Sequence, residues 1–146
     1  MEKEKGIKVN FDYYDLEENL AVESVWALKE KDYYRIKNIP FFAPNIAYDD
    51  LISVEEDEEE LFFDDIIEAS GNSTLQIVFF SEEDIKTVTN KLESFLCGWE
   101  GSHLKKYISV NVPKEVDYHV VKDYLNSMLD KNKLDYKEAC LAHNLL

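Results

Sequence analysis

Short apolar segments separated by Pro, Asn-Asp and Gly-Asn punctuation make up most of the first half of the chain. This pattern is typical of short β-strands joined by turns. Strands are predicted over residues 22–28, 33–39, 51–54, 61–69 and 74–80. The first half is therefore expected to form a strongly bent sheet or a partial barrel.

The last of these strands is expected to lie in the centre of a sheet. It is apolar on both faces, with Leu75, Ile77 and Phe79 on one side and Val78 and Phe80 on the other. Strands covered on both faces have this character. Phe79 is accordingly predicted to lie in the core.

The period changes after Ser81, which is a good N-cap for a helix that carries acids in its first turn and ends near Gly98. Residues 106–112 alternate and predict a strand, with Tyr107, Ser109 and Asn111 on its polar face. Pro113 is expected to open a second helix, and residues 134–141 are expected to form the last strand. The second half is a βαβαβ arrangement with both helices on one face of a sheet.

These elements predict an α+β protein with a β-rich N-terminal half. Residues 1–20 are interpreted as a polar N-terminal arm, and residues 21–146 as one domain. Within that domain, residues 21–80 are β-rich and residues 81–146 contain the helices. A chain of 146 residues is long enough to bury a substantial core.

Several segments resemble one bacterial family, the domain-of-unknown-function family numbered 4265. They are Glu-Ser-Val-Trp-Ala at residues 23–27, residues 34–42, Ile46-Ala47 with Asp49 and Asp50, and Ser-Gly-Asn-Ser-Thr at residues 70–74. The likeness runs from about Val22 to His143. It implies a bacterial origin and this architecture, and it assigns no catalytic residue.

The composition is that of a soluble globular protein with a strong negative field. Sixteen Lys and Arg residues face 31 Asp and Glu residues, for a net charge of −15. Such a field repels nucleic acid and anionic membranes, favours basic partners and keeps a protein soluble. Because the chain has no signal peptide and no apolar run long enough to span a bilayer, a cytoplasmic location is expected.

The most unusual local feature is the acidic run Glu55, Glu56, Asp57, Glu58, Glu59 and Glu60. It is interpreted first as a solvated turn, second as a contact for a basic partner and last as a metal site. A calcium loop spaces its ligands and contains a Gly for the sharp turn, and this run does neither. No metal and no cofactor are therefore expected.

No catalytic motif is present in the sequence. Cys97 with His103, or Cys140 with His143, has the residue types of a nucleophile and a base, but each cysteine lies in a predicted helix stripe or strand. A cysteine in such a position is usually a small buried apolar group. No catalytic residue is therefore assigned.

The segment after the first predicted helix contains residue types that interfaces favour, namely Trp99, His103 and Tyr107. A Trp in a loop also packs at the edge of a core, and both interpretations stay open. Together with the acidic run, these residues are the candidate partner-binding site.

The sequence therefore predicts a non-enzymatic module that binds another protein, one version being an acidic immunity or antitoxin protein that neutralises a basic toxin. The alternative is a small enzyme or small-molecule sensor. Its pocket would lie between the β-rich and helical halves, around Tyr48, Asp49 and Asp50.

Overall fold

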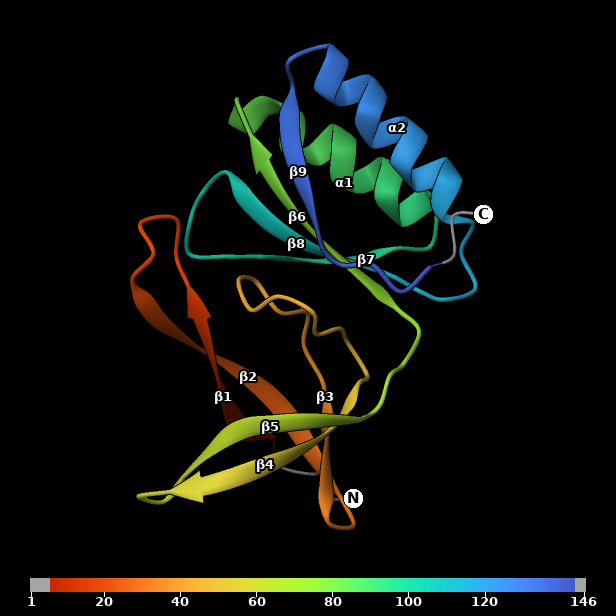
Figure 1. Cartoon of the computed structure of the whole chain (residues 1–146). Helices are drawn as coiled ribbons and strands as arrows, with labels where there is room; N and C mark the ends of the chain where they lie inside the picture. Colours follow the sequence, from red (N-terminus) through yellow and green to blue (C-terminus); the bar gives the residue numbers. More distant parts are fainter. Residues whose placement is uncertain (1–5, 144–146) are drawn as a thin grey trace.

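The computed structural model describes residues 6–143 and consists of a closed five-stranded barrel followed by a four-stranded sheet with two helices (Figure 1). The barrel strands are β1 (Ile7–Tyr14), β2 (Leu20–Glu30), β3 (Tyr33–Ile36), β4 (Leu51–Asp57) and β5 (Glu60–Glu68). The second part contains β6 (Ser73–Phe79), the 3₁₀ turn η1 (Glu82–Asp84), α1 (Ile85–Ser94), β7 (Gly98–Gly101), β8 (Tyr107–Val112), α2 (Tyr118–Asp130) and β9 (Leu134–Cys140). The predicted α+β class is confirmed.

The barrel forms because consecutive strands pair antiparallel and the first and last strands pair with each other. Val9 and Asn10 of β1 lie parallel to Leu61 and Phe62 of β5, which closes the sheet on itself. Closure removes the free edges that an open sheet would expose. Alternate residues of the strands fill the interior, among them Val9, Phe11, Val25, Ala27, Ile36 and Ile52.

The predicted N-terminal arm needs correction, because Ile7–Tyr14 is strand β1 of the barrel. Val9 and Phe11 are buried, and the strand pairs with β2 along its whole length. The alternation of apolar and polar residues was present in the sequence, but the polar members gave the segment the composition of an arm. Residues 1–5 of that predicted arm lie outside the described residues.

The second part has the β-α-β-β-α-β order of ferredoxin-like folds. The strand order is β7-β8-β6-β9, and every neighbouring pair is antiparallel. Both helices pack on one face of the sheet (Figure 1), where Leu75, Ile77 and Phe79 meet Val88, Leu92, Val121 and Leu125. The central place of β6 is confirmed, although Val78 and Phe80 are exposed.

Strand β7 was not predicted, and its presence changes the expected βαβαβ order. Its sequence is Gly-Trp-Glu-Gly, which has low strand propensity. Antiparallel pairing with β8 imposes the extended conformation. Gly98 is consequently the first residue of a strand, and α1 ends earlier, before Leu96 with its φ of 68°.

The two helices begin later than predicted. The Ser81 hydroxyl accepts a hydrogen bond from the Glu83 amide and opens the 3₁₀ turn that precedes α1. Helix α2 begins at Tyr118, because the Asp117 carboxylate accepts from the amide of His119 at 3.0 Å and acts as the N-cap. Pro113 lies in the connection before this cap.

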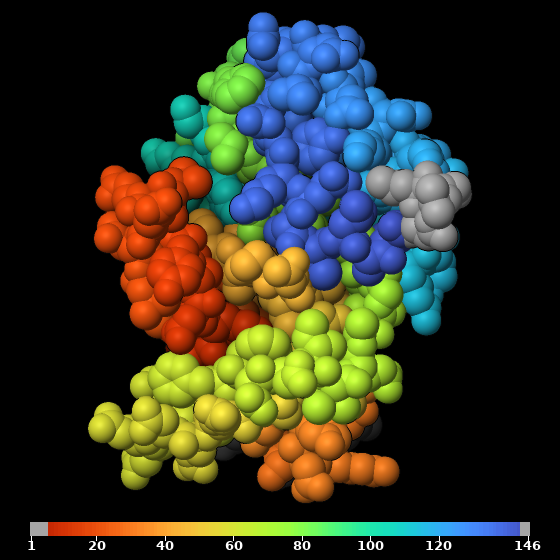
Figure 2. Space-filling model, viewed as in Figure 1, coloured from red at the N-terminus to blue at the C-terminus, as the bar shows by residue number. Residues whose placement is uncertain are grey.

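The acidic run is a β-hairpin and not a long loop. Residues 55–57 end β4, Glu60 begins β5, and only Glu58 and Glu59 form the turn. Both turn residues have positive φ, 49° and 70°, as in the tightest hairpin turns. All six acids are exposed, and the tip of the hairpin projects at the lower left of the molecule (Figure 2).

Replacing Phe79 with Ala is expected to lower the free energy of unfolding by about 3–5 kcal/mol, since the ring is fully enclosed in the core. Phe80→Ala is the matched control, because the neighbouring ring is 52% exposed. Its cost should stay below about 1 kcal/mol. Urea unfolding measures both, and equal losses for the two variants would contradict the assigned core.

Replacing Glu58 with Asn and Glu59 with Gly is expected to stabilise the protein by about 1 kcal/mol, because Asn and Gly adopt positive φ with less strain than Glu. The charge-matched control is E58Q/E59Q, which removes the same two charges without relieving the backbone. A gain of the same size in the control would show that charge repulsion, and not backbone strain, limits this hairpin.

Candidate functional site: a cleft between the barrel and the sheet

Residues 37–50, here called the bridging loop, join β3 to β4 and lie against the sheet face opposite the helices (Figure 1). Polar side chains of the sheet hold the carbonyl groups of this loop. The hydroxyls of Ser109 and Thr74 donate to the carbonyls of Ile39 and Ile46 at 3.3 and 3.0 Å. The Tyr107 hydroxyl donates to a third loop carbonyl, that of Phe41.

On the barrel side, the carboxylate of Glu23 holds the amide groups of the same loop. Its two oxygens accept hydrogen bonds from Phe41, Phe42 and Ala43 at 2.6, 3.0 and 2.9 Å. Glu23 belongs to the inward-facing row of β2 and is 8% exposed. A buried charge is stable only when it is well hydrogen-bonded, and three backbone donors meet that need.

Two further carboxylates fix the ends of the bridging loop. Asp50 is buried and accepts from the amides of Ala47 and Ser70 at 2.9 and 2.8 Å. Glu100 of β7 accepts from the amide of Ile39. Burial raises the pKa of Glu100, the nearby charge of Glu23 raises it further, and the hydrogen bond from Ile39 acts in the opposite direction.

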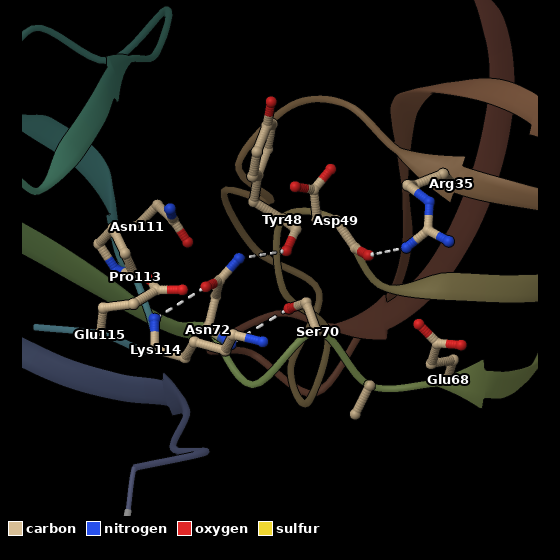
Figure 3. A pocket seen from close by; sticks show the side chains of 11 residues that line it. Arg35, Tyr48, Asp49, Glu68, Ser70, Asn72, Asn111, Pro113, Lys114 and Glu115 are labelled. Carbon is tan, nitrogen blue, oxygen red and sulfur yellow. Dashed lines mark hydrogen bonds between the residues drawn. The ribbon is translucent and has the colours of Figure 1, made fainter.

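A cavity of about 430 Å³ opens where the barrel, the bridging loop and the sheet meet (Figure 3). Arg35 and Glu68 line it from the barrel, and Lys114 and Glu115 from the segment after β8. Asn72 crosses between the two parts: its side-chain amide donates to the carbonyl of Tyr48 at 2.9 Å and accepts from the Lys114 amide at 3.0 Å.

A second cavity of about 330 Å³ lies nearby, between the bridging loop and strand β7. Its walls include Lys37, Trp99 and Glu100. Tyr48 and Asn111 line this cavity as well as the first. We refer to the two cavities together as the cleft.

Asn111 is a cleft residue with a buried side-chain atom that lacks a hydrogen-bond partner among the described residues. Tyr107 and Ser109, on the same face of β8, each donate to the bridging loop. Asn111 is 8% exposed, and its side-chain oxygen has no hydrogen-bond partner among the described residues. An unsatisfied buried acceptor costs about 1–3 kcal/mol, so a partner that entered the cleft would recover this energy.

The space beside Asn111 exists because its neighbour on β7 is a glycine. Gly98 pairs directly with Asn111 in the ladder. A Cβ at this position would meet only the Ile39 side chain, at 4.0 Å. A glycine inside a strand often marks a place where another group approaches the backbone closely.

Comparison with known proteins identifies the family. The model of the family described as "Domain of unknown function (DUF4265)" matches residues 23–136. The chain belongs to this family. A solved structure titled "Novel crystal structure of a hypothetical protein from Neisseria gonorrhoeae" is 34% identical, with a TM-score of 0.85 over 98% of this chain and 100% of that chain. No curated protein matches the sequence.

Of the residues predicted to build a pocket in this DUF4265 protein, Tyr48 and Asp49 line the cleft. Asp49 forms an ion pair with Lys37 at 2.8 Å. Asp50 points into the protein and holds the backbone, as described above. Sequence reasoning missed Asn111 and Gly98 as site residues, although the polar face of β8 was predicted and contains Asn111.

Of the candidate partner-binding residues, His103 and Tyr107 lie near each other, since both rings are close to that of Phe42, whereas the acidic run lies on another part of the molecule. The acids of residues 55–60 cover the barrel hairpin. The Trp99 ring nitrogen donates to Glu93 at 3.0 Å, and His103 is exposed. Tyr107 stacks on Phe42 with ring centroids 5.2 Å apart. Binding of a partner by these residues stays a prediction.

The two cysteines lack the environment of a nucleophile. Burial raises the pKa of the Cys97 thiol to about 11, and burial together with the charge of Asp50 raises that of Cys140 to about 11. Reactive thiols have lowered pKa values. Among the described residues, no group of three or more His, Cys, Asp and Glu side chains is placed to hold a metal ion.

A serine and a histidine that are distant in sequence do meet. The Ser73 hydroxyl lies 2.6 Å from His143 Nδ1, and His143 Nε2 lies 2.9 Å from the Pro113 carbonyl. Ser73 is fully buried and also accepts from the Ala142 amide at 2.9 Å. This arrangement fastens the segment after β9 to the sheet and leaves the hydroxyl inaccessible to a substrate.

Replacing Glu23 with Gln is expected to lower the free energy of unfolding by about 2–4 kcal/mol, because one amide oxygen cannot satisfy three buried donors. Glu17→Gln is the control, since Glu17 is exposed in the turn between β1 and β2. Chemical unfolding compares the variants. A loss equal to that of the control would mean that Glu23 does not hold the bridging loop.

Proposed function

We propose that this protein is a small-molecule-binding protein and that its ligand occupies the cleft and contacts Asn111. The observation that carries the proposal is that Asn111 lines both cavities while its enclosed side-chain oxygen has no hydrogen-bond partner among the described residues. Buried polar groups in proteins nearly always have a partner, and the exceptions need an explanation. A bound ligand is such an explanation.

The dimensions and the lining of the cleft support this proposal. Each cavity falls within the range of about 300–1,000 Å³ that ligand sites occupy. The walls combine two aromatic rings, Tyr48 and Trp99, with backbone-fixed amide and carboxylate groups. This version of the predicted pocket is a binding site or sensor, because neither thiol is activated for catalysis.

None of the helices in the described part of the chain has the length and apolar character that crossing a membrane requires. We propose a bacterial cytoplasmic protein, in line with the bacterial source of the similar crystal structure.

Replacing Asn111 with Leu is expected to raise the free energy of unfolding by about 1 kcal/mol, because it removes an unsatisfied acceptor. The same variant is expected to lose ligand binding. Ser109→Ala is the matched control on the same strand face: it removes a satisfied hydroxyl and should lower stability by a similar amount.

The measurements are urea unfolding and a screen of small metabolites by thermal shift, in which a ligand raises the melting temperature of the wild-type protein. Compounds that stabilise the N111L variant as much as the wild type would contradict the proposed site. A marked loss of stability in N111L would contradict the assignment of an unsatisfied oxygen.

We also propose, as a second candidate function, that the acidic hairpin attracts a basic protein partner, with an immunity or antitoxin role as one version. The six exposed acids of residues 55–60 on a projecting hairpin favour it (Figure 2). Exposed charges of this kind act at long range and chiefly raise the rate of association.

The test is a pull-down from the native host followed by binding kinetics at two salt concentrations. Lys substitutions at Glu55 and Glu56 should lower the association rate several-fold, and added salt should have the same effect on the wild type. Trp99→Ala should act mainly on dissociation if that ring contacts the partner. An association rate indifferent to salt would contradict this function.

A further inference from the structure

We infer that the ligand of the cleft is an organic cation whose amine or guanidine N–H groups donate to the side-chain oxygen of Asn111. This inference rests on the proposed function, since it names the ligand class for the same site. It is carried by the chemistry of Asn111, by the charges around the cleft and by the position of the Tyr48 ring.

In the orientation that the Asn111 side chain adopts here, the atom without a partner among the described residues is the oxygen, and an oxygen can only accept a hydrogen bond. Carboxylates and phosphates that are fully ionised offer acceptors and no donors, so an anionic group cannot complete this bond. Ammonium and guanidinium groups carry several donors and no acceptor, and hydrogen bonds from a charged donor are the stronger ones.

The charges around the cleft also favour a cation. Arg35 and Lys37 already have carboxylate partners: Arg35 binds both oxygens of Glu30 at 2.6 and 2.7 Å, and Lys37 pairs with Asp49 at 2.8 Å. Three further carboxylates and one further lysine line the cleft. None of these four groups forms an ion pair with the described residues. The acids are Glu68, Glu100 and Glu115, and the lysine is Lys114.

The cleft therefore has an excess of negative charge, which adds to the net charge of −15 of the whole chain. The hydrogen bond to Glu30 is the main cause of the raised pKa of Arg35, and the charge of Glu68 raises this pKa further without an ion pair between the two residues. A positive ligand would offset this excess, whereas a carboxylate ligand would increase it.

The Tyr48 ring in the wall of the cleft favours a cation as well. The Lys37 ammonium lies over the Tyr48 ring, 5.7 Å from its centroid, so this ring already attracts a cation. Tyr48 lines both cavities, and its hydroxyl makes no hydrogen bond with the described residues. A cation in either cavity would therefore meet the Tyr48 side chain.

The experiment uses the full chain and three sets of compounds matched in length. Agmatine and cadaverine are the cationic probes, glutarate is the anionic probe and 1,5-pentanediol is the neutral probe. Calorimetry and NMR titration are recorded at low and high salt. We expect the cations to bind in preference to the other probes, and the affinity to fall with added salt.

Three variants locate the binding. N111L should weaken cation binding by about tenfold or more, through loss of a charge-assisted hydrogen bond. Gly98→Val should block the second cavity while keeping or raising stability, since a Cβ there meets only Ile39 and valine favours strands. If N111L does not fold, Gly98→Val gives the same information.

The third variant tests the charges of the cleft against those of the surface. E68Q/E115Q removes two acids that line the first cavity, and E55Q/E56Q removes two from the exposed hairpin. Only the first pair should weaken cation binding several-fold. Equal effects of the two pairs would show that the cations follow the general field of the protein, and would overturn the inference.

Other outcomes separate this inference from the proposed function. Binding of glutarate or pentanediol that is lost in N111L would overturn the cationic ligand class and support the cleft as a binding site. Cation binding that is unchanged in both N111L and G98V would overturn the inference. If no compound of any class shows binding that depends on Asn111 or Gly98, the proposed function fails as well.

Discussion

The buried carboxylate of Glu23 is the contact on which the arrangement of the barrel, the bridging loop and the sheet depends. Residues 37–50 contain no helix or strand, so the amide and carbonyl groups that they bury need partners elsewhere. The barrel supplies an anion that accepts from three successive amides, and the sheet supplies hydroxyls that donate to carbonyls. Together with Glu100 of β7, which accepts from the Ile39 amide, these contacts fix the loop between the barrel and the sheet, and the position of the loop sets the walls of the cleft.

The strand β8 shows how far the sequence predicts such a site. The alternation of residues 106–112 correctly predicted a strand with Tyr107, Ser109 and Asn111 on one polar face. What covers that face could not be predicted, because the covering segment lies more than 60 residues away and has no periodicity. Glu23 is a similar case: its inward position follows from the alternation of β2, but its partners are plain backbone amides, which any sequence carries.

Strands β1 and β7 were not predicted, and the reason differs between them. In β1 the alternation of Ile7, Val9 and Phe11 with polar residues is regular, and the high polar content hid it. In β7 there is no local signal, since two of its four residues are glycines. Pairing with β8 overrides the local preference there, as tertiary context often does for strands. The site residue Gly98 belongs to this second, unpredictable class.

Two places in the molecule carry residues that lower local stability, one through side-chain bonding in a strand pair and the other through backbone conformation in a turn. Gly98 and Asn111 form a directly paired position in which a strand glycine lies beside an unsatisfied buried amide, and both features cost stability. Glu58 and Glu59 occupy positive-φ positions in an exposed turn, where Asn and Gly are favoured. Such residues are expected where function requires them. Asn111 is buried in the cleft, whereas Glu58 and Glu59 are exposed to solvent at the tip of the hairpin. Because the cleft and the hairpin tip are built by different segments, a variant at one need not disturb the other, and each function can be tested in the presence of an intact alternative.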